Sequence, residues 1–437
     1  MHRGGAIPTT EPLATCVAVV EALRDGRYKE ACDVFGPQLR AVAPAKTVRT
    51  AWTAEVVSRG AVTAIGAPVS ERAEARTVVR VPVTCERGGL VVVMSVDDAT
   101  GLLNGLRLAP AGAGEPWEPP AYADPSAFDE QEVLLGSGPL AVPGTLSLPR
   151  VSGASGERPA VVLLSGGGPF DRDETSGCNK PLKDLAWGLA CRGIAVLRFD
   201  KVTYAHPGPV TDDHGFTAAD EYIPHAVEAI RLLQRHPAVA AGRVFVLGHS
   251  MGGKIAPRVA AAAPEVAGMV VMAGDTSPMQ WAAVRVTRYL ASLDPGPGSA
   301  AAAQSAIETL TKQAEMVDSP GLGPATPADR VPLGWSAAYW LDLRGYDAVG
   351  TAAVVNKPML ILQGGRDYQV TVADDLAGWR AGLAGRADVD IRVYEADDHM
   401  FFPGAGPSSP ERYAAPQHVD PAVVADVADW IAGESAG

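Results

Sequence analysis

One short stretch of the sequence, VFVLGHSMGGKIA at residues 244–256, constrains the fold more than any other. An apolar run ends at Gly248, a serine follows at Ser250, and a second glycine, Gly252, precedes a segment of helical character. A strand that turns at once into a helix strains the backbone at the turn, and side chains at the flanking positions would collide with neighbouring elements. The serine Oγ is then exposed at a helix N-terminus, where the dipole favours developing negative charge. The stretch therefore predicts Ser250 as a nucleophile.

A serine needs a base to become nucleophilic, and the base needs an orienting carboxylate. Asp367 follows an apolar run in LILQGGRD, and His399 follows the next such run in VYEADDH. The order serine, acid, histidine is the one expected when the serine sits on a turn of this kind. Asp397 and Asp398 are alternative acids, but they are close in sequence to His399 and would reach its Nδ1 poorly. His418, near the C-terminal end, is predicted to be a surface residue.

Backbone donors for an oxyanion are predicted at two places. The first is the N–H of Met251, the residue after the serine. The second lies in SGGGPFDRDE, where a triple glycine follows an apolar run, and Gly167 is preferred over Gly168. A merely flexible turn is the alternative interpretation of these glycines. Their place after a central strand favours the donor role.

From residue 131 onward, short apolar runs alternate with helical patterns, which predicts a mainly parallel sheet with crossover helices in residues 131–437. Each run ends in Gly, Asp, Ser or His, at the edge where open α/β sheets place their ligands. The strands and their exits are expected at 159–168, 193–200, 242–250, 267–275, 357–367 and 389–399.

Residues 277–356 interrupt this alternation with about eighty residues that contain no convincing strand. We predict a helical cap inserted between two strands of the sheet. Its aromatic residues are candidates for substrate binding, together with one phenylalanine beside the triple glycine; the alternative is that they form the core of the cap. These candidates are Trp335, Tyr339, Trp340 and Phe170.

Two polar residues in RFDKVTYAH have a less specific signal. Asp200 and Lys201 could line the floor of a pocket. A buried aspartate that ties loops together is the favoured interpretation.

The first part of the chain has a different character. Residues 12–40 are helical in pattern, and residues 61–110 are rich in valine with turn signals, as in an antiparallel meander. This predicts a small α+β domain at 1–112. Residues 113–130 are rich in proline, which is typical of a linker between domains.

Composition limits the classes of protein to consider. The formal net charge of -13 argues against a nucleic-acid surface, which needs clustered Lys and Arg. No apolar run approaches the length of a membrane span, and no secretory signal is readable. Five cysteines without a CxxC pair indicate free thiols in a reducing compartment, so we expect a cytoplasmic protein. No zinc spacing or P-loop indicates a metal or another cofactor. A small acyl substrate is the expected partner, and a homodimer is allowed but not demanded.

Together, GHSMG at 248–252, GGRDYQV with Asp367 and DDHMF with His399 make the chain resemble the α/β-hydrolase superfamily over residues 131–435. SGGGPFDRDE, RFDKVTYAHPG and YWLDLRGYD resemble a bacterial subgroup of prolyl-oligopeptidase-like or dienelactone-hydrolase-like esterases. Members of that subgroup carry an N-terminal domain of the DUF3887 type, which is similar to the NTF2-like cone fold. Ser165 departs from the pattern, because many relatives have the histidine of a His-Gly motif there.

The resemblance implies an α/β-hydrolase fold and a serine hydrolase that cleaves a carboxylic ester or thioester through an acyl-enzyme. An acyltransferase or cyclase that uses the same acyl-enzyme, for instance in a biosynthetic pathway, is the first alternative. A non-catalytic binding protein is the second, and the intact set of serine, aspartate and histidine argues against it.

Overall fold

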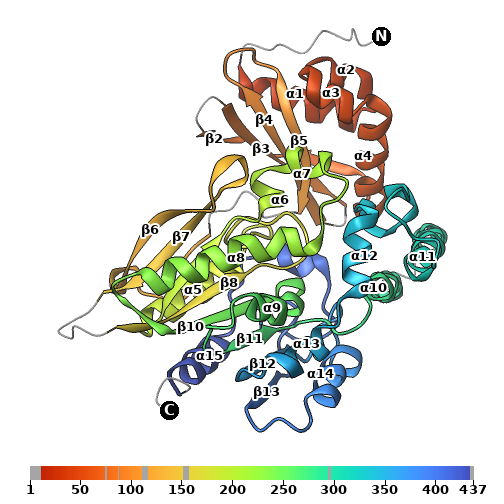
Figure 1. Cartoon of the computed structure of the whole chain (residues 1–437). Helices are drawn as coiled ribbons and strands as arrows, with labels where there is room; N and C mark the ends of the chain where they lie inside the picture. Colours follow the sequence, from red (N-terminus) through yellow and green to blue (C-terminus); the bar gives the residue numbers. More distant parts are fainter. Residues whose placement is uncertain are drawn as a thin grey trace, which may run out of the picture. The chain divides into compact units, whose positions relative to one another are not determined.

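The computed structural model describes residues 11–73, 76–86, 88–110, 117–150, 157–293 and 297–433 (Figure 1). The chain divides into two compact units. The first comprises residues 1–117 with the short segments Ser176–Asn179 and Pro410–Pro416, and the second comprises the remainder.

The first unit is an α+β fold. The Val-rich stretch expected to form a meander is an antiparallel sheet in the order β1-β3-β4-β5, and β2 also pairs with β3. Alternate valines of β3, such as Val79 and Val81, are buried, and they share one core with Val20 and Leu23 of α1. The elements are α1 (Pro12–Arg24), α2 (Tyr28–Asp33), α3 (Pro37–Val42), α4 (Ala45–Arg59), β1 (Val62–Ile65), β2 (Val69–Ala73), β3 (Arg76–Cys85), β4 (Gly88–Asp97) and β5 (Leu103–Pro110).

The second unit contains an eight-stranded sheet in the order β13-β12-β11-β10-β8-β9-β7-β6. Strands β8 to β13 are parallel, whereas β7 runs antiparallel to both β9 and β6. Helices cover the central strands, which explains why these strands are nearly continuous apolar runs. The strands are β6 (Phe128–Leu135), β7 (Val142–Pro149), β8 (Arg158–Leu164), β9 (Ala195–Phe199), β10 (Val239–His249), β11 (Met269–Met272), β12 (Met359–Gly364) and β13 (Val389–Tyr394).

Strand β6 corrects the predicted linker. It begins at Phe128, inside the range 113–130, and it belongs to the large sheet. The proline signal at Pro125 comes from a single 3₁₀ turn that leads into the strand, in which Asp124 accepts a hydrogen bond from the Ser126 N–H at 2.8 Å. Residues 113–116 of the predicted linker lie outside the described residues.

Helices pack on the sheet in two groups (Figure 1). Helices α5 (Pro181–Cys191) and α15 (Pro421–Gly433) pack on each other, and α5 contacts β7 and β9. Helices α8 (Ala218–Arg235) and α9 (Met251–Ala262) pack side by side against β10, and α13 (Ala348–Val355) packs on α9. Helix α8 starts with a capping box between Thr217 and Asp220.

The insertion between β11 and β12 contains helices, turns and irregular segments, and no strand in its described part. It contains α10 (Met279–Leu293), α11 (Pro297–Asp318) and α12 (Ala337–Gly345), followed by α13. Because α13 packs on α9 like an ordinary crossover helix, the cap proper is α10 to α12 and ends before residue 356. Arg258 of α9 and Asp342 of α12 tie the cap to the sheet domain through two hydrogen bonds of 2.9 and 2.8 Å.

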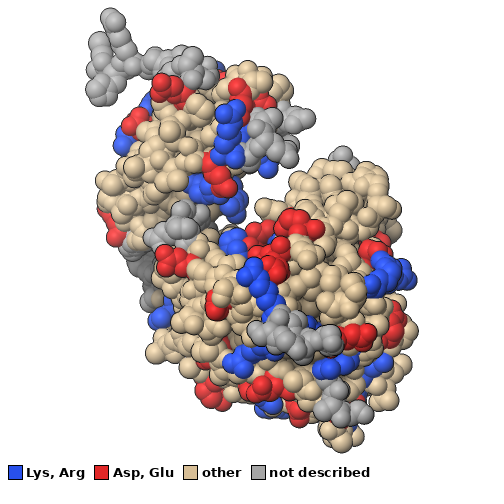
Figure 2. Space-filling view, turned by 90° about the vertical axis from the view of Figure 1, so that its left-hand side faces the viewer, with Lys and Arg blue, Asp and Glu red and all other residues tan. Residues whose placement is uncertain are grey.

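Charged side chains of both signs are intermixed on the face in Figure 2, with no broad basic area among the described residues. No described helix is long and apolar enough to cross a membrane.

Candidate active site

Ser250 lies at the sharp turn between β10 and α9, with φ 52° and ψ -122°. Residues other than glycine rarely adopt this backbone conformation. The flanking glycines are required by space: a Cβ at Gly248 would lie 2.1 Å from the Gly252 carbonyl oxygen, and one at Gly252 would lie 2.5 Å from the Leu164 carbonyl oxygen. The glycine pattern therefore lets the turn close tightly against β8 and expose the serine.

His399 lies in the loop after β13 and reaches both other candidate residues. Its Nε2 is 3.1 Å from Ser250 Oγ, and its Nδ1 is 2.7 Å from Asp367 Oδ2. The other carboxylate oxygen of Asp367 accepts the N–H groups of Gln369 (2.8 Å) and Val370 (3.0 Å). The turn after β12 thus fixes the carboxylate, which in turn orients the imidazole.

The alternative acids have other surroundings. Asp398 Oδ1 accepts the N–H groups of Met400 and Phe402, at 3.0 and 3.2 Å. Burial, together with the nearby Asp420, raises the pKa of Asp397 to about 7. The remaining histidine considered above, His418, pairs with Asp184 of α5.

The two backbone donors named for the oxyanion lie beside each other. A Cβ at Gly167 would be 3.4 Å from Met251 Sδ and 3.6 Å from Met251 Cβ. Met251 occupies the first turn of α9, where backbone N–H groups have no partner within the helix. Within the described residues, neither the Gly167 N–H nor the Met251 N–H has a hydrogen-bond acceptor. Gly168 has φ 114° and turns the chain away.

A buried pair behind the site was not anticipated. His249 Nδ1 lies 2.9 Å from Glu174 Oε1, and its Nε2 lies 2.8 Å from the His399 carbonyl oxygen. Burial lowers the pKa of His249, but the Glu174 carboxylate outweighs this and brings the pKa above its usual range. Both ring nitrogens face acceptors, so a doubly protonated ring satisfies both. Both residues stand within the quoted motifs, but neither motif indicates that they pair.

Asp200 is a buried aspartate that ties loops together, which is the interpretation favoured from the sequence. Its carboxylate accepts the Arg172 backbone N–H at 2.8 Å and Arg172 Nε at 2.9 Å. It therefore ties the loop after β8 to the end of β9. Lys201 is buried under the glycine loop and is not a lining residue of the cavity described next.

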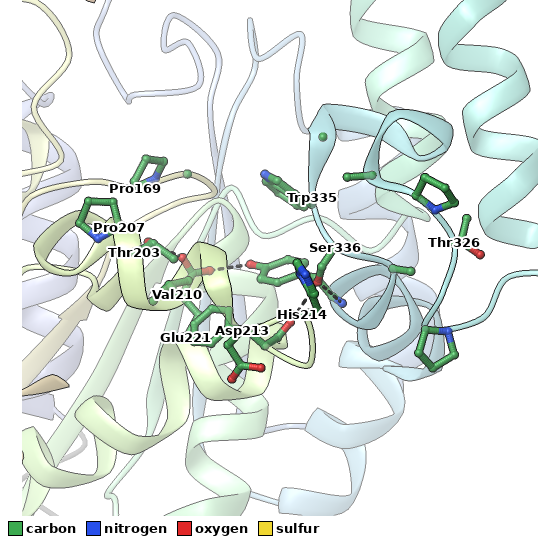
Figure 3. A pocket seen from close by; sticks show the side chains of 18 of the residues that line it. Pro169, Thr203, Pro207, Val210, Asp213, His214, Glu221, Thr326, Trp335 and Ser336 are labelled. Carbon is green, nitrogen blue, oxygen red and sulfur yellow. Dashed lines mark hydrogen bonds between the residues drawn. The ribbon is translucent and has the colours of Figure 1, made fainter. Parts of the chain in front are cut away.

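A cavity of about 630 Å³, drawn in Figure 3, lies beside the loop that follows β8. Ser250 is not one of its lining residues, but Gly168 is, and the hydroxyl of lining residue Tyr339 is 3.7 Å from Met251 Sδ. The other walls come from α6 (Val202–Ala205), α7 (Pro207–Asp212) with the loop after it, Glu221 of α8 and the cap. Most lining side chains are apolar, and the titratable ones in the described chain are Asp213, His214, Glu221 and Tyr339.

The four aromatic residues predicted to bind substrate divide into two groups. Trp335 and Tyr339 line the cavity, with their ring centroids 4.8 Å apart. Trp340 is fully buried, stacks on Trp335 and donates to the Pro332 carbonyl at 3.1 Å, so it belongs to the core of the cap. Phe170 lies against Gly168 and is not a lining residue. Trp340 and Phe170 thus lie outside this cavity, and the substrate contacts predicted for the four residues stay predictions.

Residues 160–403 match the family model described as serine aminopeptidase, S33. Esterase EstD of Thermotoga maritima is 35% identical over 346 residues, which cover 79% of this chain and 77% of the esterase. Among solved structures, an esterase of Pyrococcus furiosus aligns at 16% identity with a TM-score of 0.42, covering 73% of this chain and 98% of that one. Puromycin hydrolase aligns at 15% identity with a TM-score of 0.45, covering 86% and 48%.

The sheet, its serine turn, the family match over residues 160–403 and the similarity to esterase EstD define an α/β hydrolase of the serine hydrolase class. Within that class, the chain belongs to the serine aminopeptidase S33 family. The narrower subgroup inferred from sequence, and the DUF3887 and NTF2-like character of the first unit, stay predictions.

Proposed function

We propose that the protein hydrolyses a carboxylic ester or thioester through an acyl-enzyme on Ser250, with His399 as the general base and Asp367 as its orienting partner. The main support is the hydrogen-bonded line of these three side chains, with distances of 3.1 and 2.7 Å. In this arrangement an imidazole can take the serine proton while the hydroxyl attacks a carbonyl. The similarity to a protein named as an esterase supports the same reaction class.

The proposed reaction has two halves. Ser250 Oγ attacks the carbonyl carbon as its proton passes to His399 Nε2, and the N–H groups of Gly167 and Met251 stabilise the oxyanion. Collapse of the tetrahedral intermediate expels the alcohol or thiol, which takes the proton from His399. Water then attacks the acyl-enzyme as its proton passes to His399, and the second tetrahedral intermediate collapses as His399 returns this proton to Ser250 Oγ, which releases the carboxylic acid.

The cavity supports a preference within this class of substrates. Its volume of about 630 Å³ suits a bulky group, and its apolar walls suit an uncharged one. Asp213 and Glu221 line it, and no Lys or Arg does so in the described chain. An anionic group would find no Lys or Arg among the described lining residues, because Lys201, which pairs with Glu221 at 3.1 Å, is buried and does not line the cavity. We therefore infer that the acyl or alcohol group bound there is large, apolar and uncharged.

A fluorophosphonate probe tests the nucleophile. We expect the probe to label the wild-type protein, and Ser250→Ala to lose both labelling and turnover of p-nitrophenyl butyrate. Ser292→Ala, which removes a hydroxyl at the exposed end of α10, serves as the control and should be labelled normally. Full labelling of Ser250→Ala would contradict the proposal.

No observation in the described residues favours acyl transfer or cyclisation over hydrolysis. Cytoplasmic location, a homodimer and the small acyl partner stay predictions as well.

A further inference from the structure

The Gly166 carbonyl oxygen is held by two buried side chains. Lys201 Nζ donates to it at 2.9 Å, and the Tyr222 hydroxyl donates to it at 2.8 Å. At the other side of the same residue, the Gly166 N–H donates to Glu174 Oε1 at 2.8 Å. The residue that precedes Gly167 is thus bound at both of its backbone polar groups.

This carbonyl shares a peptide group with a candidate oxyanion donor. A peptide group is planar, so the direction of the Gly166 carbonyl fixes the direction of the Gly167 N–H, which points to the opposite side. The peptide lies close against the nucleophile, because a Cβ at Gly166 would be 3.2 Å from Ser250 Cβ. Whatever holds the Gly166 carbonyl therefore aims the Gly167 N–H.

All donors of the Lys201 ammonium are used in this cluster. They reach the Gly166 carbonyl, the Tyr222 hydroxyl at 2.8 Å and Glu221 Oε1 at 3.1 Å. All of these side chains are at most 3% exposed. Burial lowers the pKa of Lys201, and the Glu221 carboxylate opposes this effect. An apolar side chain of similar length would avoid the cost of desolvating an ammonium, but it would leave the buried Glu221 carboxylate without its cation.

A cation at the carbonyl oxygen polarises the peptide group, which makes its N–H a stronger donor. Such a donor acts on negative charge that exists only in the tetrahedral intermediate and its flanking transition states. We propose that Lys201 is a positioning residue that sets the direction and donor strength of the Gly167 N–H, with Tyr222 as a second support. The inference rests on the proposed function and gives Lys201 no contact with substrate.

Lys201→Met tests the inference, with phenylboronic acid as the probe. The boronate adds to a serine Oγ and forms a tetrahedral anion, so it reports on oxyanion stabilisation. We expect kcat for p-nitrophenyl butyrate to fall by about ten- to a hundredfold with KM within about threefold, somewhat less than the loss of a whole oxyanion donor. The affinity for phenylboronic acid should fall by the same factor as kcat/KM.

Lys254→Met is the matched control. Lys254 is also buried and paired with one carboxylate, Asp275, at 2.6 Å. Its loss should lower the thermal stability to a similar extent and leave kcat and boronate affinity within about threefold of the wild type. An equal loss of boronate affinity in Lys254→Met would show that the effect of Lys201→Met is general destabilisation, and this would overturn the inference. Unchanged boronate affinity in Lys201→Met would overturn it as well.

If Lys201→Met does not fold, Tyr222→Phe tests the same inference. It removes one hydroxyl and keeps the ring, so we expect kcat and boronate affinity to fall together by about two- to tenfold. Unchanged values for both would contradict the inference. Failure of the proposed function has a different signature: the wild type would then bind neither the fluorophosphonate nor the boronate.

Discussion

Ser250 has a strained backbone. Asp367, in contrast, is held by hydrogen bonds at both of its carboxylate oxygens. The Asp367 carboxylate uses one oxygen for two backbone N–H groups, and the other faces His399 and accepts the Gln363 side-chain amide at 3.3 Å. These bonds give the two oxygens distinct tasks. One holds the turn after β12 together, and the other orients the imidazole.

This division makes Asp367→Asn a precise change. The amide oxygen can keep the bonds to the Gln369 and Val370 N–H groups, so the fold should persist. The amide NH₂ then faces His399 Nδ1 and favours the wrong tautomer. We expect kcat to fall by about ten-thousandfold with little change in Tm, as measured with p-nitrophenyl butyrate and by calorimetry.

The control for this change is Asp398→Asn, which alters the neighbouring loop without a contact to His399 Nδ1. It should retain most of the activity. A greater loss in Asp398→Asn than in Asp367→Asn would show that the acid is assigned wrongly.

At the scale of single elements, α12 and the segment before it connect the cap to the site. Trp335 precedes α12, and Tyr339 lies in its first turn. The Tyr339 hydroxyl donates to Glu221 of α8 at 2.5 Å. The cap therefore supplies one wall of the cavity and is bonded to the opposite wall.

Trimming that wall should change the response to substrate size. For Trp335→Ala we expect kcat/KM to fall by about tenfold for p-nitrophenyl octanoate, because apolar contact is lost. For p-nitrophenyl acetate we expect at most a twofold change, because acetate is too short to reach the cavity. Steady-state kinetics on the two esters measures the ratio.

Trp281→Ala provides the comparison, since Trp281 lies on cap helix α10 and bonds Asp318, away from the cavity lining. It should affect both esters alike. Equal losses for both esters in Trp335→Ala would instead place Trp335 with the core of the cap.

At the scale of the whole molecule, local patterns predicted more than long-range pairings. The strand–serine–helix turn, the two late strand ends and the strandless insertion are each encoded within a few neighbouring residues. These local patterns predicted the α/β-hydrolase fold and the candidate residues Ser250, Asp367 and His399. The start of β6 was misplaced because Pro125 signals a turn whether or not a strand follows.

Residues that act through distant partners left no such signal. Glu174 pairs with His249, 75 positions away, and Lys201 holds a carbonyl 35 positions away. Trp335 and Trp340 are close in the sequence, yet one lines the cavity and the other is core. Composition does not reveal which side of a helical segment faces a cavity.

Asp397 makes stability depend on pH in an unusual direction. Its pKa is raised from 3.8 to about 7, first by burial and then by Asp420. As the pH rises between these values, the unfolded chain loses the proton while the folded chain keeps it. The contribution of Asp397 to stability thus declines through this window and is constant above it. Asp397→Asn should raise Tm more at about pH 8 than at about pH 5, as measured by calorimetry.

Asp388→Asn should show the opposite sign, because the hydrogen bond from Arg386 lowers the pKa of Asp388. The contribution of Asp388 to stability is present above its unfolded pKa and is lost as the pH falls. A lower Tm of Asp388→Asn relative to the wild type should therefore appear at about pH 8. A Tm difference for Asp397→Asn that does not change with pH would contradict the assignment of a raised pKa.

The place where the cap joins the sheet has a consequence for engineering. Strands β11 and β12 are direct neighbours, with Met272 opposite Leu362, and α13 already connects them as a crossover. The helices α10 to α12 leave and return between adjacent strands, so a segment can be exchanged here without rethreading the sheet. Helix α10 also supports the site, because Arg285 donates to the Gln369 carbonyl at 2.8 Å and Tyr289 stacks on Tyr368, next to Asp367. A library of segments grafted in place of α11 and α12 alone would therefore vary the substrate pocket while α10 keeps the loop that carries Asp367 in place.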